Sequence, residues 1–237
     1  MKKQHFNIGI WAVVLIICFT GCKKYYFDSG IHDPKFDGNT IQYMEQKKPF
    51  FDSTLMVLEL AGMKQVIQNE EVTFFAPPSG CITRAVLGLN KYLQFNGKDT
   101  VKQLDQIKPE VWKNLISNYI FKGKNLLKDY PQRDTISYVA YPGQNYTSYA
   151  GRIMNIGVIF NDAGGVQYAG YRQLFLAYIP DLSNPQIALR NIPVATSDIQ
   201  TNNGVLHVLN RKKHTFGFFV DSFIDQAISA GITPLTP

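Results

Sequence analysis

The sequence has little cysteine and histidine, the residues on which most transition-metal sites and many nucleophilic mechanisms depend. There are three cysteines and four histidines among 237 residues. His32, His207 and His214 each stand alone, without a second ligand at the spacing of a zinc motif. We therefore expect no metal site and no cofactor. The alternative is an enzyme built on Cys81 and a histidine base, which an exposed and reactive Cys81 would indicate.

Three further absences exclude other classes of protein or site. No stretch has the dense run of lysine and arginine, or the paired basic and aromatic motif, that a nucleic-acid surface shows. The longest apolar run, residues 8–17, is shorter than the roughly twenty residues that span a bilayer. Residues 162–165 lack the alternating acidic ligands of a calcium loop and predict a hairpin turn. We expect no nucleic-acid partner and no membrane-spanning helix.

The first 22 residues have the organisation of an export signal. Lys2 and Lys3 precede the apolar run, which closes on Phe19-Thr20-Gly21-Cys22. A basic head, a short apolar stretch and small residues before a cysteine are typical of a bacterial lipoprotein signal, cleaved before Cys22 and acylated on its thiol. The position after Cys22 holds Lys23 and not an acidic residue, which favours the outer membrane, on either its surface or its periplasmic face. The alternative is an ordinary signal cleaved elsewhere, because Phe19 replaces the usual leucine.

Removal of residues 1–21 would leave 216 residues with 22 basic and 18 acidic side chains, a formal net charge of +4. With Cys22 acylated, Cys81 would be the one free thiol, so no intramolecular disulfide could form. We favour a small core residue for Cys81. A hydrophobic content of 45% suffices for one core. We expect a tether over residues 22–37, one domain over 38–213, and an extension with a helix over 214–237.

Hydrophobic periodicity predicts helices in the first half of that domain and strands in the second. The expected helices cover residues 40–44, 51–63 with one further turn at 64–67, a segment capped by Ser79, a segment opening at Pro109, and 219–228. Asp52 or Ser53 is the expected cap of the second of these. The expected strands are 72–76, 135–141, 152–160, 166–179, 192–199 and 205–210. This order predicts an α+β fold.

Three segments carry a family resemblance. Val72-Thr73-Phe74-Phe75-Ala76-Pro77, followed by a helix, resembles the first signature of the fasciclin domain. Asn202-Asn203-Gly204-Val205-Leu206-His207-Val208-Leu209-Asn210 resembles the second, and residues 115–123 occupy the place of the central helix motif. The resemblance implies a single fasciclin-like domain, with N-terminal helices packed on a mixed or antiparallel sheet as a sandwich or wedge. Its structural motif residues would be Phe75, Ala76, Pro77, Tyr119, Asn203, Gly204 and His207.

The same residues have structural roles on physical grounds. The Asn203-Gly204 pair predicts a tight turn with positive φ angles, followed by a strand in which His207 alternates with buried neighbours. We interpret His207 as a hydrogen-bonded structural histidine rather than a catalyst, because no nucleophile motif accompanies it. Tyr119 stands where histidine is common in the family.

Residues 135–190 form an expected β insert that is rich in tyrosine. Aromatic faces beside amide and guanidinium groups suit sugar rings or a protein partner. The candidate binding surface comprises Tyr138, Tyr141, Tyr146, Tyr149, Tyr168, Tyr171 and Arg172. The alternative is that these tyrosines pack one face of a sheet.

Together these features predict a non-enzymatic, lipid-anchored protein of a Gram-negative outer membrane. The family resemblance implies adhesion or extracellular binding of a protein or glycan. The alternative is an accessory binding subunit of a starch-utilisation-type, TonB-dependent outer-membrane nutrient importer.

Overall fold

The computed structural model describes residues 34–134, 136–185 and 189–234, which form one compact unit. The predicted signal and Cys22 lie outside these residues. The helices are α2 (Thr40–Gln46), α3 (Asp52–Leu60), α4 (Lys64–Asn69), α5 (Ser79–Phe95), α6 (Pro109–Ile116) and α7 (Val220–Ala230), with 3-10 turns at Leu104–Gln106, Ser117–Tyr119 and Leu127–Asp129. Within the described ranges, no helix has the length and apolar character needed to cross a membrane.

Seven strands form one mixed sheet in the order β2-β1-β7-β6-β5-β4-β3. They are β1 (Val72–Ala76), β2 (Ile120–Lys122), β3 (Gln144–Thr147), β4 (Ile153–Phe160), β5 (Arg172–Tyr178), β6 (Arg190–Gln200) and β7 (Gly204–Leu209). β1 and β7 are parallel, and all other neighbours are antiparallel. The sheet is nearly barrel-shaped, because the Tyr149 N–H, just beyond β3, donates to the Ile120 carbonyl of β2 at 2.8 Å.

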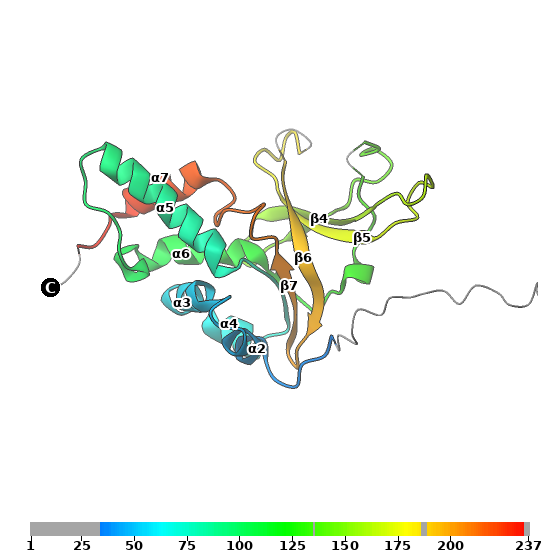
Figure 1. Cartoon of the computed structure of the whole chain (residues 1–237), viewed down its shortest axis with the longest axis horizontal. Coiled ribbons are helices and arrows are strands. Elements are labelled where there is room, and N and C mark those ends of the chain that lie inside the picture. Colours follow the sequence, from blue (N-terminus) through cyan, green and yellow to red (C-terminus); the bar gives the residue numbers. More distant parts are fainter. Residues whose placement is uncertain (1–33, 135, 186–188, 235–237) are drawn as a thin grey trace, which may run out of the picture. The chain divides into compact units, whose positions relative to one another are not determined.

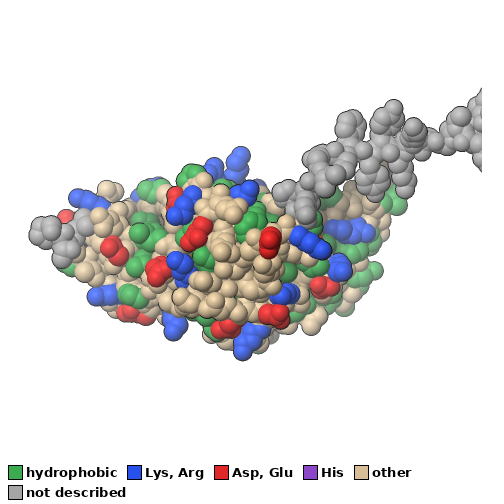
Figure 2. Space-filling model, turned by 90° about the horizontal axis from the view of Figure 1, so that it is seen from below, with side chains coloured by type: hydrophobic (Ala, Val, Ile, Leu, Met, Phe, Trp, Pro, Cys, Tyr) green, Lys and Arg blue, Asp and Glu red, His purple; other side chains and the backbone are tan. Residues whose placement is uncertain are grey.

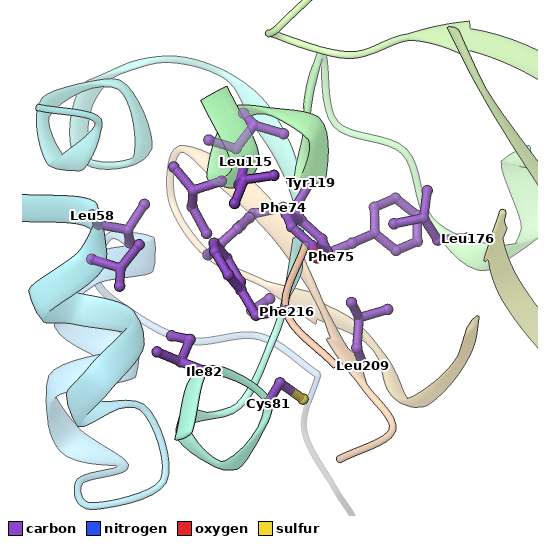
Figure 3. Packing of buried hydrophobic residues seen from close by; sticks show 14 of the residues in the cluster. Leu58, Phe74, Phe75, Cys81, Ile82, Leu115, Tyr119, Leu176, Leu209 and Phe216 are labelled. Atoms are coloured by element: carbon purple, nitrogen blue, oxygen red, sulfur yellow. The ribbon is translucent and has the colours of Figure 1, made fainter. Parts of the chain in front are cut away.

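Strand β1 is buried on both faces, which explains why β-branched and aromatic residues occupy both of them. Figure 1 shows α5, α6 and α7 together on one side of β7, with β4 and β5 on the other. In Figure 3, Phe74 points towards Phe216 and the helices, whereas Phe75 points towards Leu176. The Phe75 ring also packs on the His207 ring, with 4.9 Å between their centroids. The first motif therefore joins the helical layer to the interior of the sheet.

The expected helices are confirmed, but two of the expected caps are wrong. α6 begins at Pro109, α7 closes the chain, and α4 is the expected further turn. Phe51 is the N-cap residue of α3, and Asp52 lies in its first turn. Pro78, not Ser79, is the N-cap residue of α5. The Ser79 hydroxyl instead accepts a hydrogen bond from the Ser53 N–H at 3.1 Å, so it links α5 to α3.

Two strand predictions within the insert are wrong in part. Residues 136–140 form bends and turns, and β3 begins only at Gln144. The predicted strand at 166–179 begins at Arg172, because a loop closed by a bond from the Gly170 N–H to the Asn161 carbonyl precedes it. The hairpin turn at 162–165 is confirmed, since Ala163 and Val166 exchange both backbone bonds. Residues 120–122, expected at the end of a helix, form β2.

The prediction of positive φ angles at Asn203-Gly204 is wrong, because neither residue has one. Glycine is required at 204 for a different reason: a Cβ there would lie 2.5 Å from the Val72 carbonyl oxygen of β1. The Asn203 amide donates to the carbonyls of Ile67 (2.8 Å) and Glu70 (3.0 Å) and accepts from the Thr40 N–H (3.1 Å). The second motif therefore fixes α2 and α4 against the parallel strand pair.

Candidate functional site

His207, the histidine of the second motif, is fully buried and bonded through both ring nitrogens. The Asp198 N–H donates to Nδ1 at 3.2 Å, so the proton is on Nε2, which lies 3.0 Å from the Asn125 carbonyl. Burial lowers the pKa of His207 to about 4, which keeps the ring neutral. Asp198 sits at an irregularity of β6, with φ 64°. These contacts give His207 a structural role between β6, β7 and the loop after β2.

Tyr119, at the central helix motif, is buried in an aromatic stack. Its ring lies parallel to those of Phe216 and Phe218, with centroids 5.6 and 4.7 Å away. Its hydroxyl accepts from the Gly217 N–H at 2.9 Å and lies 2.9 Å from His214 Nε2. Burial, with a smaller contribution from Arg190 and Arg84, lowers the pKa of His214 to about 3. Tyr119 is therefore inaccessible to a ligand and packs the junction of α6 with the segment after β7.

Cys81 is fully buried in the first turns of α5 (Figure 3). Burial raises the pKa of its thiol to about 12, despite the nearby charges of Arg84 and Arg211. The enzyme alternative needs an exposed thiolate at this position. Among the described residues, no group of three or more His, Cys, Asp or Glu side chains could hold a metal ion.

The tyrosine-rich insert holds two loops together. The Tyr168 hydroxyl donates to Asp134 Oδ2 at 2.6 Å, and the Tyr141 ring packs edge-on against Tyr168 with 5.8 Å between centroids. The bond from Tyr168 lowers the pKa of the Asp134 carboxyl. Tyr168 has φ 61°, an uncommon conformation for a large residue. The loop that carries Asp134 and Tyr141 is thereby tied to the loop over residues 161–171.

These two loops expose large apolar side chains. Four of them, which we call the loop tip, are Ile136 (94% exposed), Val139 (92%), Val166 (60%) and Tyr171 (68%). Tyr138 is half-buried on the same loop as Ile136. Arg172 is already engaged: its guanidinium lies 3.6 Å from the centroid of the Phe160 ring and donates to the carbonyls of Tyr168 and Gly170. The loop tip is therefore apolar rather than cationic.

The remaining tyrosines of the predicted surface lie elsewhere. Tyr146 packs edge-on against Tyr130, with 5.4 Å between centroids. Tyr149 donates to Glu70 at 3.0 Å and lines a separate pocket of about 420 Å³, together with Tyr178 and Arg152. The structure thus brings together Tyr141, Tyr168 and their loop neighbours, but separates them from Tyr146 and Tyr149.

A third set of residues was not singled out by the sequence. Arg84, Arg190, Lys212 and Lys213 line a pocket of about 530 Å³ between the start of α5, strands β5 and β6, and the loop after β7. The short basic run at 211–213 was the available signal in the sequence. It is too short to indicate a binding surface by itself, and its partners lie far away along the chain.

In the part of the chain that the structure describes, the motif residues hold the fold together, and the exposed apolar side chains of the loop tip lie on two loops. The fold and this site therefore define a class of protein in which a packed scaffold presents exposed loops. A family model, the fasciclin domain, matches residues 49–212. The chain therefore belongs to the fasciclin domain family.

A structural comparison finds a similar fold in a FAS1 domain pair from the insect cell adhesion molecule fasciclin I. The two share 13% sequence identity with a TM-score of 0.46, over 74% of this chain and 52% of that one. The chain thus matches about half the length of that domain pair. No curated protein sequence matches this chain.

Proposed function

We propose that this chain is a non-enzymatic adhesion or binding protein, anchored in the outer membrane through an acylated Cys22, that contacts a protein partner through the loop tip. The observation that carries the proposal is the exposure of four large apolar side chains on two loops held together by Tyr168. Exposed apolar side chains gain most from being covered by a partner, and pre-ordered loops lose less entropy on binding. Fasciclin domains occur in adhesion proteins, which supports the same role.

The burial of the reactive side chains favours binding over catalysis. Cys81, His207 and His214 are the candidate nucleophile and bases, and each is at most 1% exposed. Burial holds the thiol protonated and both imidazoles neutral. A substrate could not reach Cys81 or His207 without opening the core, whereas adhesion requires only complementary surfaces.

An affinity pull-down of the lipidated protein from native outer membranes tests the proposal. The variant Ile136→Ser/Val139→Ser removes two loop-tip side chains. Leu87→Ser/Phe95→Ser is the matched control, since Leu87 (55% exposed) and Phe95 (91%) lie on the outer face of α5. We expect mass spectrometry to recover a partner with the wild type and the control, and at least tenfold less with the loop-tip variant. Equal recovery with all three proteins would exclude the loop tip.

The same experiment distinguishes the importer alternative. Recovery of one importer barrel in near-equal amount would make the chain an accessory binding subunit. Recovery of a different surface protein would support adhesion, and recovery of no partner would contradict protein binding.

A further inference from the structure

The basic pocket, defined by Arg84, Arg190, Lys212 and Lys213, concentrates charge of one sign. All four side chains belong to exposed residues, and none forms an ion pair with a carboxylate among the described residues. The lining contains no acidic residue and is completed by Phe175, Asn191, Pro193, His214 and Thr215. On the face shown in Figure 2, by contrast, basic and acidic side chains are interspersed. Cations that converge on a hollow without counter-charges favour an anionic ligand.

His214 adds a hydrogen-bond donor to this lining. The Tyr119 hydroxyl accepts from the Gly217 N–H, and the acceptor within reach of its own proton is His214 Nε2. The neutral imidazole then carries its proton on Nδ1. That atom is buried and has no partner among the described residues. A buried donor without an acceptor is unusual in a native protein and calls for a ligand or a water molecule.

Asn191 presents the opposite need in the same pocket. Its Oδ1 is buried and has no donor among the described residues. A simple inorganic anion such as sulfate has no proton to give to this oxygen at neutral pH. A ligand that satisfies both Asn191 and His214 must therefore carry a hydrogen-bond donor, such as a hydroxyl, as well as an acceptor.

We propose that the basic pocket binds an acidic sugar, a saccharide unit that carries a carboxylate or a sulfate group. The anionic group lies among the guanidinium groups of Arg84 and Arg190 and the two lysines, where charge-assisted bonds are strongest. A ring hydroxyl donates to Asn191 Oδ1, His214 Nδ1 donates to a ligand oxygen, and the half-buried Phe175 ring offers an apolar face. A volume of about 530 Å³ is typical of a small-molecule site.

This proposal goes beyond the protein contact at the loop tip and does not depend on it. It assigns a second ligand class to a separate surface, formed by α5, β5, β6 and the segment after β7. Failure to recover a pull-down partner would not contradict the sugar site. Failure of sugar binding would not contradict the loop-tip contact.

Isothermal titration of the full chain in detergent tests the proposal. The probes are trigalacturonate, a sulfated disaccharide, neutral maltotriose and inorganic sulfate. The pocket variant is Arg190→Gln/Lys213→Gln. The control is Lys91→Gln/Lys128→Gln, which removes two exposed positive charges outside the pocket. Both double variants should keep the wild-type thermal midpoint.

We expect at least one acidic saccharide to bind the wild type and the control equally, and the pocket variant at least tenfold more weakly. Maltotriose should not bind, and Asn191→Ala should weaken the saccharide but not inorganic sulfate. Three results would each overturn the proposal: neither acidic saccharide binds, both double variants lose binding equally, or inorganic sulfate binds as tightly as the saccharides.

Discussion

Two buried histidines make the stability of this domain depend on pH. Burial lowers the pKa of His207 to about 4 and that of His214 to about 3, whereas an unfolded chain has histidines near 6.5. The unfolded chain therefore takes up protons first as the pH falls. The contribution of these residues to stability is complete above about pH 6.5. It is lost between 6.5 and 4 for His207, and between 6.5 and 3 for His214.

We expect the free energy of unfolding to fall by about 1 kcal/mol for each buried histidine as the pH is lowered from 6 to 5. Urea denaturation at a series of pH values measures this slope. His207→Gln, which keeps a donor towards Asn125, should remove about half of it. A variant with the wild-type slope would show that His207 does not carry this dependence.

Cys81 gives a second prediction at this scale. Its buried thiol, with a pKa raised to about 12, should not react with an aromatic disulfide reagent in the native protein at pH 8. In the mature chain with Cys22 acylated, one equivalent should react in urea, and a Cys81→Ala variant should lose that signal. Prompt reaction of the native protein would revive the enzyme alternative.

Among the elements, the parallel strands β1 and β7 approach each other closely at Gly204. A Cβ at Gly204 would lie 2.5 Å from the Val72 carbonyl oxygen, which belongs to the backbone and cannot turn aside. We expect Gly204→Ala to lower the free energy of unfolding by about 1–3 kcal/mol, as overpacking does. Chemical denaturation of purified variants measures it.

Gly80→Ala is the matched control for this substitution. Its Cβ would meet only the flexible Arg211 side chain at 2.8 Å, which can move into solvent. The change should be neutral or slightly stabilising, because alanine favours the helix. Equal losses at both positions would show that the approach of β1 to β7 is not the cause.

The elements that could be predicted from sequence are those with strong local signals. α6 begins at Pro109, and the Gly164-Gly165 pair forms the predicted hairpin turn. Residues 135–141 were misassigned because Ile136 and Val139 have the composition of a strand but are exposed on a loop. The β-propensity of a residue measures how well it suits a half-buried sheet, and it does not show whether the residue is buried. The prediction of positive φ angles at Asn203-Gly204 was wrong for a related reason. Glycine is needed at 204 because strand β1 lies beside it, and the local sequence does not show that neighbour.

At the scale of the whole molecule, both proposed binding sites depend on residues that only the complete fold brings together. The loop tip needs the contact between Tyr168 and Asp134, 34 positions apart. The basic pocket joins Arg84 to Arg190 and Lys213, more than a hundred positions further along the chain. Sequence periodicity cannot reveal such neighbours, so the predicted tyrosine surface was divided and the basic pocket was missed.

Attachment to the membrane also belongs to this scale and remains a proposal. Cells that express the chain and are fed labelled palmitate should incorporate it into the wild type but not into Cys22→Ser. The wild type should fractionate with the outer membrane, and the variant should not. Label retained by the variant would mean that Cys22 is not the acylated residue.

The backbone at the start of the domain is bonded to the sheet. The Gln200 N–H donates to the Pro34 carbonyl at 2.7 Å, and the Phe36 N–H donates to the Gln200 carbonyl at 2.8 Å, in a parallel bridge to the end of β6. If a bound partner pulls against an anchor upstream of Pro34, the pull enters the domain here. Both bonds then carry the load at once, in shear. The first point of the fold to resist tension is therefore this bridge, and its rupture force would limit how long the protein holds on under flow.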